Sequence, residues 1–198
     1  MRWLGVVPDK KTPLVVCLGY FDGVHLGHLN LINTAKDIAN KKGYKICVHT
    51  YDAPPQSLLE PDKKYTELTN LSQKGELLRL AGVDYIAFSR FDNNLMKKSG
   101  ADFLDEELSA NMSVKHIVAG FNHRFGHLGK TDVKELQKLC DERGIGLSIV
   151  PAVKTKSGAV ISSTAIKKAL SSGDVSLAQE MLGRAPEEHC LNNFKDFI

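Results

Sequence analysis

The sequence has no long apolar run. No stretch of about 18 consecutive apolar residues is present, which argues against a membrane-spanning helix. The first residues, MRWLGVVPDKK, lack the apolar core and the small-residue cleavage site of a signal peptide. These two absences predict a cytoplasmic protein that does not use a membrane.

Cysteine is scarce, and its spacing matches no common metal or disulfide pattern. The four cysteines, Cys17, Cys47, Cys140 and Cys190, lie far apart and form no CxxC pair. Cys17 and Cys47 fall inside apolar runs that have the character of buried strands. We therefore predict four reduced thiols, rather than disulfides or a zinc site.

The sequence also lacks a large excess of charge of either sign, with 26 Lys and Arg against 23 Asp and Glu. The formal net charge of +3 is too small to indicate nucleic-acid binding, but it does not disfavour an anionic small molecule. The hydrophobic fraction of 42% and the charged fraction of 25% are ordinary for a globular protein. A chain of 198 residues is long enough to bury a sizeable core and is typical of one domain.

Short apolar runs alternate with segments of helical periodicity along the chain. The apolar runs predict strands over 14–19, 44–51, 83–88, 114–120 and 146–152. The periodic segments predict helices over 27–43, 68–82, 100–110, 131–144, 162–173 and 174–183, with Thr131 as an N-cap. Because such strands are apolar on both sides, the pattern predicts an α/β fold with a parallel sheet flanked by helices. Ligands of such sheets bind beyond the carboxyl ends of the strands.

One connection is longer than the rest. Residues 52–67, DAPPQSLLEPDKKYTE, carry three prolines. A loop of this length in a compact domain is more often a lid or a binding loop than a connection without function.

Two histidines stand at the turn between the first strand and the first helix, in GYFDGVHLGH. His25 and His28 are three residues apart, so their side chains point the same way on a first helical turn. The free N–H groups and partial positive charge of a helix start favour phosphate, and Gly23 and Gly27 permit close approach of a ligand. Two imidazoles that donate toward one anion fit this setting.

Other readings of these histidines remain open. A lone histidine at a helix start is usually structural. The spacing is not that of HExxH, but His123 and His127 form a second pair that keeps a metal site under consideration. The stretch also differs from the GxGxxG fingerprint of dinucleotide sites, which weakens a hydride-transfer reading.

A second anion cradle is predicted at the start of the helix over 162–173. Ser162, Ser163 and Thr164 place three hydroxyls at the helix N-terminus, and Lys167 and Lys168 follow within about a turn. A plain N-cap would need only one of these hydroxyls. A capping role for one would leave its neighbours free to bind phosphate.

Three segments resemble the FAD synthetase branch of the HxGH nucleotidylyltransferase superfamily. They are GYFDGVHLGH, GFNHRFGHLGKTDVKEL and ISSTAIKKALSSGDVSLAQEMLGR, and together the resemblance extends from about residue 14 to 184. It implies a Rossmann-like nucleotidylyltransferase fold and transfer of AMP from ATP to FMN, which gives FAD and pyrophosphate with Mg²⁺ as cofactor. It also implies a domain over 1–185 and a short tail over 186–198, with no riboflavin kinase domain in the tail.

The resemblance implies a role for each matched position. The ATP site would comprise Gly19, Phe21, Asp22, Gly23, His25, His28, Ser162, Ser163, Thr164 and Lys167. Within it His25, His28 and Lys167 would be catalytic. At the acceptor end Asn122 and Phe125 would contact the flavin, and Asn122 would also lie near the metal.

The chain departs from the family pattern at three positions. Lys167 replaces an arginine, which keeps the charge and loses the bidentate fork. His123 stands where phenylalanine is usual, and Pro54 where histidine is frequent. Two alternatives therefore stay open, which are adenylyl or cytidylyl transfer to another phosphorylated acceptor, and a paralogue that binds flavin nucleotides without turnover.

Overall fold

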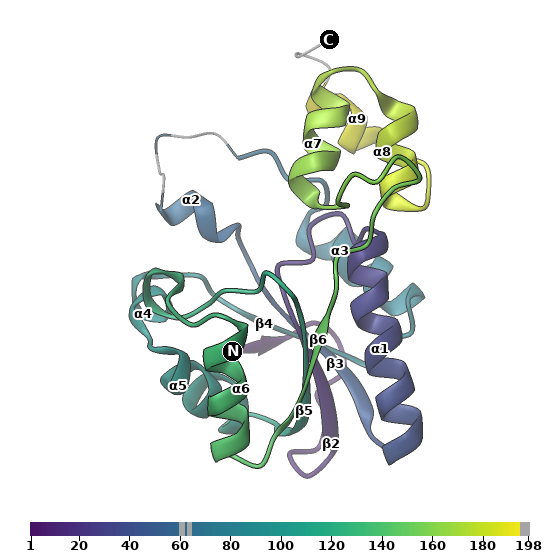
Figure 1. Ribbon diagram of the computed structural model, residues 1–198. Coiled ribbons are helices and arrows are strands. Elements are labelled where there is room, and N and C mark those ends of the chain that lie inside the picture. Colours follow the sequence, from purple (N-terminus) through teal and green to yellow (C-terminus); the bar gives the residue numbers. More distant parts are fainter. Residues whose placement is uncertain (60–61, 63–64, 195–198) are drawn as a thin grey trace.

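A six-stranded sheet forms the centre of the computed structural model, which describes residues 1–59, 62 and 65–194 (Figure 1). The strand order is β1-β4-β3-β2-β5-β6. The strands are β1 (Arg2–Trp3), β2 (Pro13–Leu18), β3 (Lys45–Tyr51), β4 (Tyr85–Ser89), β5 (Ser113–Gly120) and β6 (Gly146–Val150). β1 pairs antiparallel with β4, and the other neighbours pair parallel. The predicted α/β fold with a mostly parallel sheet is confirmed.

The five predicted strands are all present, and β1 is an addition. Its two residues pair with Phe88 and Ala87 at the edge of the sheet. Two residues are too few to show a strand period, so the pattern could not indicate it.

Both faces of the sheet are covered, as the continuous apolar runs predict. Along β2, Leu14 and Val16 join one apolar core and Val15 and Cys17 join the other. The second core includes buried residues of α1 (Leu26–Lys42) and α3 (Leu71–Leu80). The first includes residues of the π-helical η1 (Phe103–Ser109), which continues α5 (Gly100–Asp102), and of α6 (Val133–Glu142).

Two helix starts differ from the prediction because a neighbouring residue caps better. Asn70 caps α3 in a reciprocal pair with Gln73, so Leu68 lies before the helix instead of on its face. Asp132, not Thr131, caps α6, since its Oδ1 accepts from two backbone N–H groups. The four cysteines are buried and free, as predicted.

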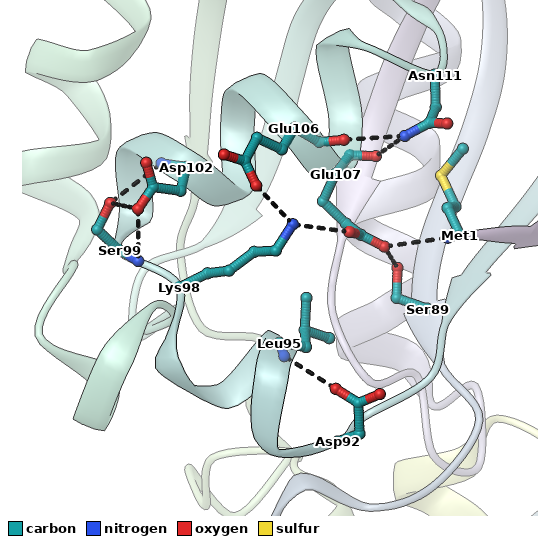
Figure 2. Close-up of polar contacts among 10 residues, drawn as sticks. All are labelled: Met1, Ser89, Asp92, Leu95, Lys98, Ser99, Asp102, Glu106, Glu107 and Asn111. Carbon is teal, nitrogen blue, oxygen red and sulfur yellow. Dashed lines mark hydrogen bonds and ion pairs between the residues drawn. The ribbon is translucent and has the colours of Figure 1, made fainter.

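A buried polar cluster joins η1 to the sheet (Figure 2). Glu107 accepts from the Ser89 hydroxyl at 2.5 Å and pairs with the Met1 ammonium at 3.3 Å and the Lys98 ammonium at 3.4 Å. The Ser89 hydroxyl also bonds His49 Nε2 at 2.9 Å. The charge of the Glu107 carboxylate is thus compensated by the Met1 and Lys98 ammonium groups within the fold.

The C-terminal helices form a layer beyond the carboxyl ends of the parallel strands (Figure 1). α7 (Ser163–Ser171), α8 (Val175–Leu182) and α9 (Glu188–Phe194) share a third apolar core that includes Ile166, Met181 and Phe194. The predicted domain boundary after residue 185 stays a prediction, and α9 shows that part of the predicted tail packs on α7. The remaining helical segments are α2 (Pro55–Leu59), α4 (Asn93–Lys97) and η2 (His127–Gly129). Over the described ranges, no helix combines the length and apolarity needed to cross a membrane.

Candidate active site

A cavity of about 640 Å³ opens where the strand order reverses, between β2 and β5. Its walls come from segments that follow the parallel strands, with Gly19 after β2, Pro54 after β3, Asn122 after β5 and Pro151 after β6. The start of α7 closes another side. This is the switch point at which parallel α/β sheets bind ligands. Pro54, Pro55, Gln56 and Tyr65 bring the long 52–67 connection to the cavity, although residues 60–61 and 63–64 lie outside the described part.

His25 and His28 lie together at the N-terminus of α1 and both line the cavity. Their rings stack with centroids 3.7 Å apart and planes 16° from parallel. His25 is the N-cap, and its Nδ1 accepts from the backbone N–H of His28 at 3.3 Å. In the neutral ring the proton of His25 therefore sits on Nε2, which makes that atom a donor. A Cβ on Gly27 would lie 3.0 Å from His25 Cε1, so a larger residue here would push against the His25 ring.

Both imidazoles are neutral at pH 7. Burial lowers the pKa of His25 to about 4. Burial is the main cause that lowers the pKa of His28 well below its usual value, and the nearby His25 and the Lys74 ammonium lower it further. Within the described residues, the buried Nδ1 of His28 has no hydrogen-bond partner. A buried nitrogen without a hydrogen bond lowers the stability of the fold. Its presence here therefore favours a functional role for His28 over a purely structural one.

The turn before α1 is strained. Phe21 has φ 56° and Val24 has φ 39°, and positive φ is a genuine outlier for a β-branched residue such as Val24. Gly23 adopts φ 80° at no such cost. Phe21 and Gly23 do not line the cavity, since Phe21 is fully buried against the His28 ring, with centroids 4.9 Å apart. Strain of this kind concentrates at binding sites and persists only where surrounding contacts enforce it.

Asp22 joins three parts of the site through its buried carboxylate. Oδ1 accepts from the backbone N–H groups of Leu68 at 2.8 Å and Thr69 at 3.1 Å. Oδ2 forms an ion pair with Lys167 Nζ at 2.6 Å. The structure thus brings two predicted ATP-site residues together from opposite ends of the sequence. It also shows that Lys167 has an internal partner, which the sequence did not indicate.

The three hydroxyls at the start of α7 have different surroundings. Ser162 is the N-cap, and its Oγ accepts from the Ala165 N–H at 3.2 Å. Ser163 Oγ donates to the Asp22 carbonyl oxygen at 2.9 Å, which fixes α7 to the strained turn. Thr164 is exposed and lines the cavity with both serines. The three hydroxyls therefore lie together at the cavity, and those of Ser162 and Ser163 also hold the local structure.

The two residues predicted to contact flavin lie at different depths. Asn122 is exposed and lines the cavity beside Phe121, whose side chain is 48% exposed. Phe125 is buried and does not line the cavity, but it stacks on the cavity residue His123 with ring centroids 5.5 Å apart. Burial lowers the pKa of His123 to about 4, so its ring is neutral as well.

The sequence reading did not identify Lys74, a second cation near the site. Its side chain is 1% exposed, and its Nζ lies 3.7 Å from the ring centroid of the cavity residue Tyr20. Burial lowers the pKa of Lys74 to about 8, while the charges of Asp22 and Glu67 oppose that shift. Lys74 lies three residues after Leu71 and four before Leu78. The sequence therefore did contain a signal for Lys74, namely a lysine on the apolar face of a helix.

The buried histidines predict that stability falls as the pH drops below neutral. Burial lowers the pKa of His25, His49 and His123 from 6.5 to about 4. Between these values the unfolded chain binds protons that the folded chain excludes, so each such histidine removes up to about 1.4 kcal/mol per pH unit. Urea unfolding at pH 7, 6 and 5 should show a falling midpoint. A midpoint that rises or stays level would contradict the burial of neutral rings.

The comparisons with known proteins agree with this geometry. A strand-to-helix turn with paired histidines, at the switch point of a parallel sheet, suits an anionic ligand such as a nucleotide phosphate. The family model for FAD synthetase matches residues 7–165. The chain belongs to the FAD synthetase family.

Relatives with curated descriptions carry names from the same family. A bifunctional riboflavin kinase/FMN adenylyltransferase of Listeria monocytogenes is 38% identical over 181 residues, which are 90% of this chain and 57% of that protein. An FAD synthetase of the same organism is 32% identical, over 90% of this chain and 72% of that protein. The chain thus spans little more than half of its bifunctional relative.

Solved structures support the fold. A chain described as a macrolide-efflux protein from Streptococcus pneumoniae has a TM-score of 0.78 and 30% identity, over 89% of this chain and 57% of that one. A pantoate-beta-alanine ligase from Francisella tularensis has a TM-score of 0.51 at 17% identity, over 96% and 80% of the two chains. The second likeness shows the fold alone.

Proposed function

We propose that this protein transfers AMP from ATP to FMN, which yields FAD and pyrophosphate. The observation that carries the proposal is the stacked pair His25 and His28, neutral and facing the cavity from a helix N-terminus, in a chain of the FAD synthetase family. ATP and FMN are small molecules of the cytoplasm, which fits the location predicted from the sequence.

The reaction needs no covalent intermediate on the protein. An oxygen of the FMN phosphate attacks the α-phosphorus of ATP, a new P–O bond forms, and the bond to the bridging oxygen breaks as pyrophosphate leaves. The chain's task is to position the phosphates and to stabilise the charge that develops on them. His25 Nε2 and the His28 ring would donate toward the phosphates, and Lys167, which is paired with Asp22, lines the same cavity from α7.

The lining of the cavity includes apolar surface for an acceptor. Phe121, Pro54 and Pro55 contribute to it, as do the polar residues Asn122 and His123. A flat flavin ring would pack on such surface, and the amide of Asn122 would bond to its polar edge. Phe125 would act through the His123 ring that it supports.

Mg²⁺ would enter this site with the phosphates of ATP. Asn122 offers an exposed amide oxygen, whereas both oxygens of Asp22 are engaged by backbone N–H groups and by Lys167. Across the residues that the structure describes, no group of three or more His, Cys, Asp or Glu side chains could hold a metal ion alone. Magnesium sites with few protein ligands and several phosphate oxygens are common, so these residues fit that mode. The bound ion would neutralise phosphate charge.

Incubation with FMN, ATP and Mg²⁺ tests the proposal directly. We expect FAD and pyrophosphate in equal amounts, with no FAD when ADP replaces ATP because the α-phosphate then has no pyrophosphate leaving group. Chromatography with flavin fluorescence separates FAD from FMN. Binding of both nucleotides without product would instead favour a flavin-nucleotide-binding paralogue, and turnover with another phosphorylated acceptor alone would overturn the choice of FMN.

A further inference from the structure

Arg184 contacts the strained turn from the far end of the chain. Its Nη2 donates to the Gly23 carbonyl oxygen at 2.7 Å, and its Nη1 donates to the Val24 carbonyl oxygen at 3.1 Å. Arg184 follows α8 and lies beyond residue 165, where the match to the family model ends. A residue beyond the end of the family model therefore bonds to the backbone that leads directly into His25.

These two carbonyls need a partner. Val24 is 2% exposed, and a buried carbonyl without a donor costs free energy. The other contacts of the turn are made elsewhere, since the Gly23 N–H donates to Thr69 Oγ1 and the Asp22 carbonyl accepts from Ser163. Among the described residues, Arg184 is the only one whose side chain donates to the carbonyl oxygens of Gly23 and Val24.

The guanidinium group suits this task for a geometric reason. Its planar fork presents two N–H donors at a fixed separation, so one side chain fixes the relative orientation of two successive peptide groups. The ammonium of a lysine is a single point donor and cannot do so. The positive φ of Val24 costs free energy, and the paired hydrogen bonds offset it.

We infer that Arg184 is a positioning residue, which holds the turn over 21–24 so that His25 and His28 face the cavity. Both hydrogen bonds of its guanidinium end on backbone oxygens, and Arg184 does not line the cavity that His25 and His28 line. The layer of α7, α8 and α9 thereby becomes part of the site, through Lys167 and Ser163 at one end and Arg184 at the other. The expected effect on turnover rests on the proposed function, whereas the expected effect on the turn does not.

Amide hydrogen exchange measures the turn without any substrate. In Arg184→Ala we expect the Gly23 and Val24 amides to exchange at least tenfold faster, while the Val16 amide in β2 keeps its protection. Arg184→Lys should give an intermediate rate, because one of the two bonds can reform. Met181→Ala removes a buried side chain of the same C-terminal core and serves as the matched control, with a lower melting temperature and unchanged exchange at Gly23.

Steady-state kinetics separate positioning from loss of folded protein. A smaller folded fraction lowers kcat and leaves both KM values unchanged. Displaced histidines should raise the KM for ATP and lower kcat about tenfold or more, with the KM for FMN unchanged. Added guanidinium at millimolar concentration should partly restore turnover to Arg184→Ala and not to Met181→Ala.

Two results would overturn the inference. One is wild-type exchange at Gly23 and Val24 in Arg184→Ala. The other is an equal acceleration at those amides in Met181→Ala at a matched shift in melting temperature. If the wild-type protein makes no FAD, the proposed function fails, and the exchange rates still decide the role of Arg184. If Arg184→Ala does not fold, the intermediate exchange expected of Arg184→Lys decides it.

Discussion

His28→Ala should lower the rate of adenylyl transfer about a hundredfold or more. The His28 ring lines the cavity at the first turn of α1 and stacks on His25. Loss of one preorganised donor to a developing oxyanion typically costs about 2.7–4 kcal/mol of transition-state stabilisation, which corresponds to a factor of 10²–10³. Because the donor acts on the transition state, kcat should fall more than the affinity for ATP does. Single-turnover formation of FAD under saturating ATP and FMN measures this step.

The controls for this variant follow from the same geometry. His28→Gln keeps an N–H donor near the cavity and should retain more activity than His28→Ala. His116→Ala removes a half-buried histidine that bonds Ser148 Oγ and lies outside the cavity, so its turnover should equal that of the wild type. Near wild-type turnover in a folded His28→Ala protein would refute the catalytic role of His28.

Local sequence was sufficient to predict that two groups of polar side chains stand at helix starts and line one cavity. His25 and His28 share one helical turn, and Ser162 to Thr164 share another, so their spacing alone indicates a common direction. Parallel sheets gather their ligand-binding turns beyond the carboxyl ends of the strands, so a common location was expected. For these residues, predicted proximity and observed cavity agree.

Contacts between distant segments could not be predicted in the same way. The partner of Lys167 is Asp22, and the partner of the Gly23 carbonyl is Arg184, more than a hundred residues away in each case. No periodicity encodes such pairs, because they depend on how α7 and α8 dock on the turn. The strand β1 was missed for a related reason, since its two residues are defined only by their pairing with β4.

Asp22→Ala should destabilise the protein by about 3 kcal/mol or more. The variant leaves the buried N–H groups of Leu68 and Thr69 without their acceptor, at about 1–3 kcal/mol each. It also leaves Lys167 without its ion pair. Because the Lys167 side chain is 29% exposed, water compensates part of that second loss, and most of the cost comes from the backbone groups. Urea unfolding at pH 7 gives the change in free energy of unfolding.

Asp22→Asn separates the two contributions. Its amide oxygen can still accept from Leu68 and Thr69, and only the charge is lost, so we expect a smaller cost, of about 1–2 kcal/mol. Asp37→Ala replaces an exposed acid on α1 and should change stability by less than about 0.5 kcal/mol. If Asp22→Ala costs no more than Asp22→Asn, the hydrogen bonds that Asp22 accepts from the Leu68 and Thr69 N–H groups are not its main contribution to stability. Its ion pair with Lys167 would then be the dominant link between α7 and the turn that carries His25 and His28.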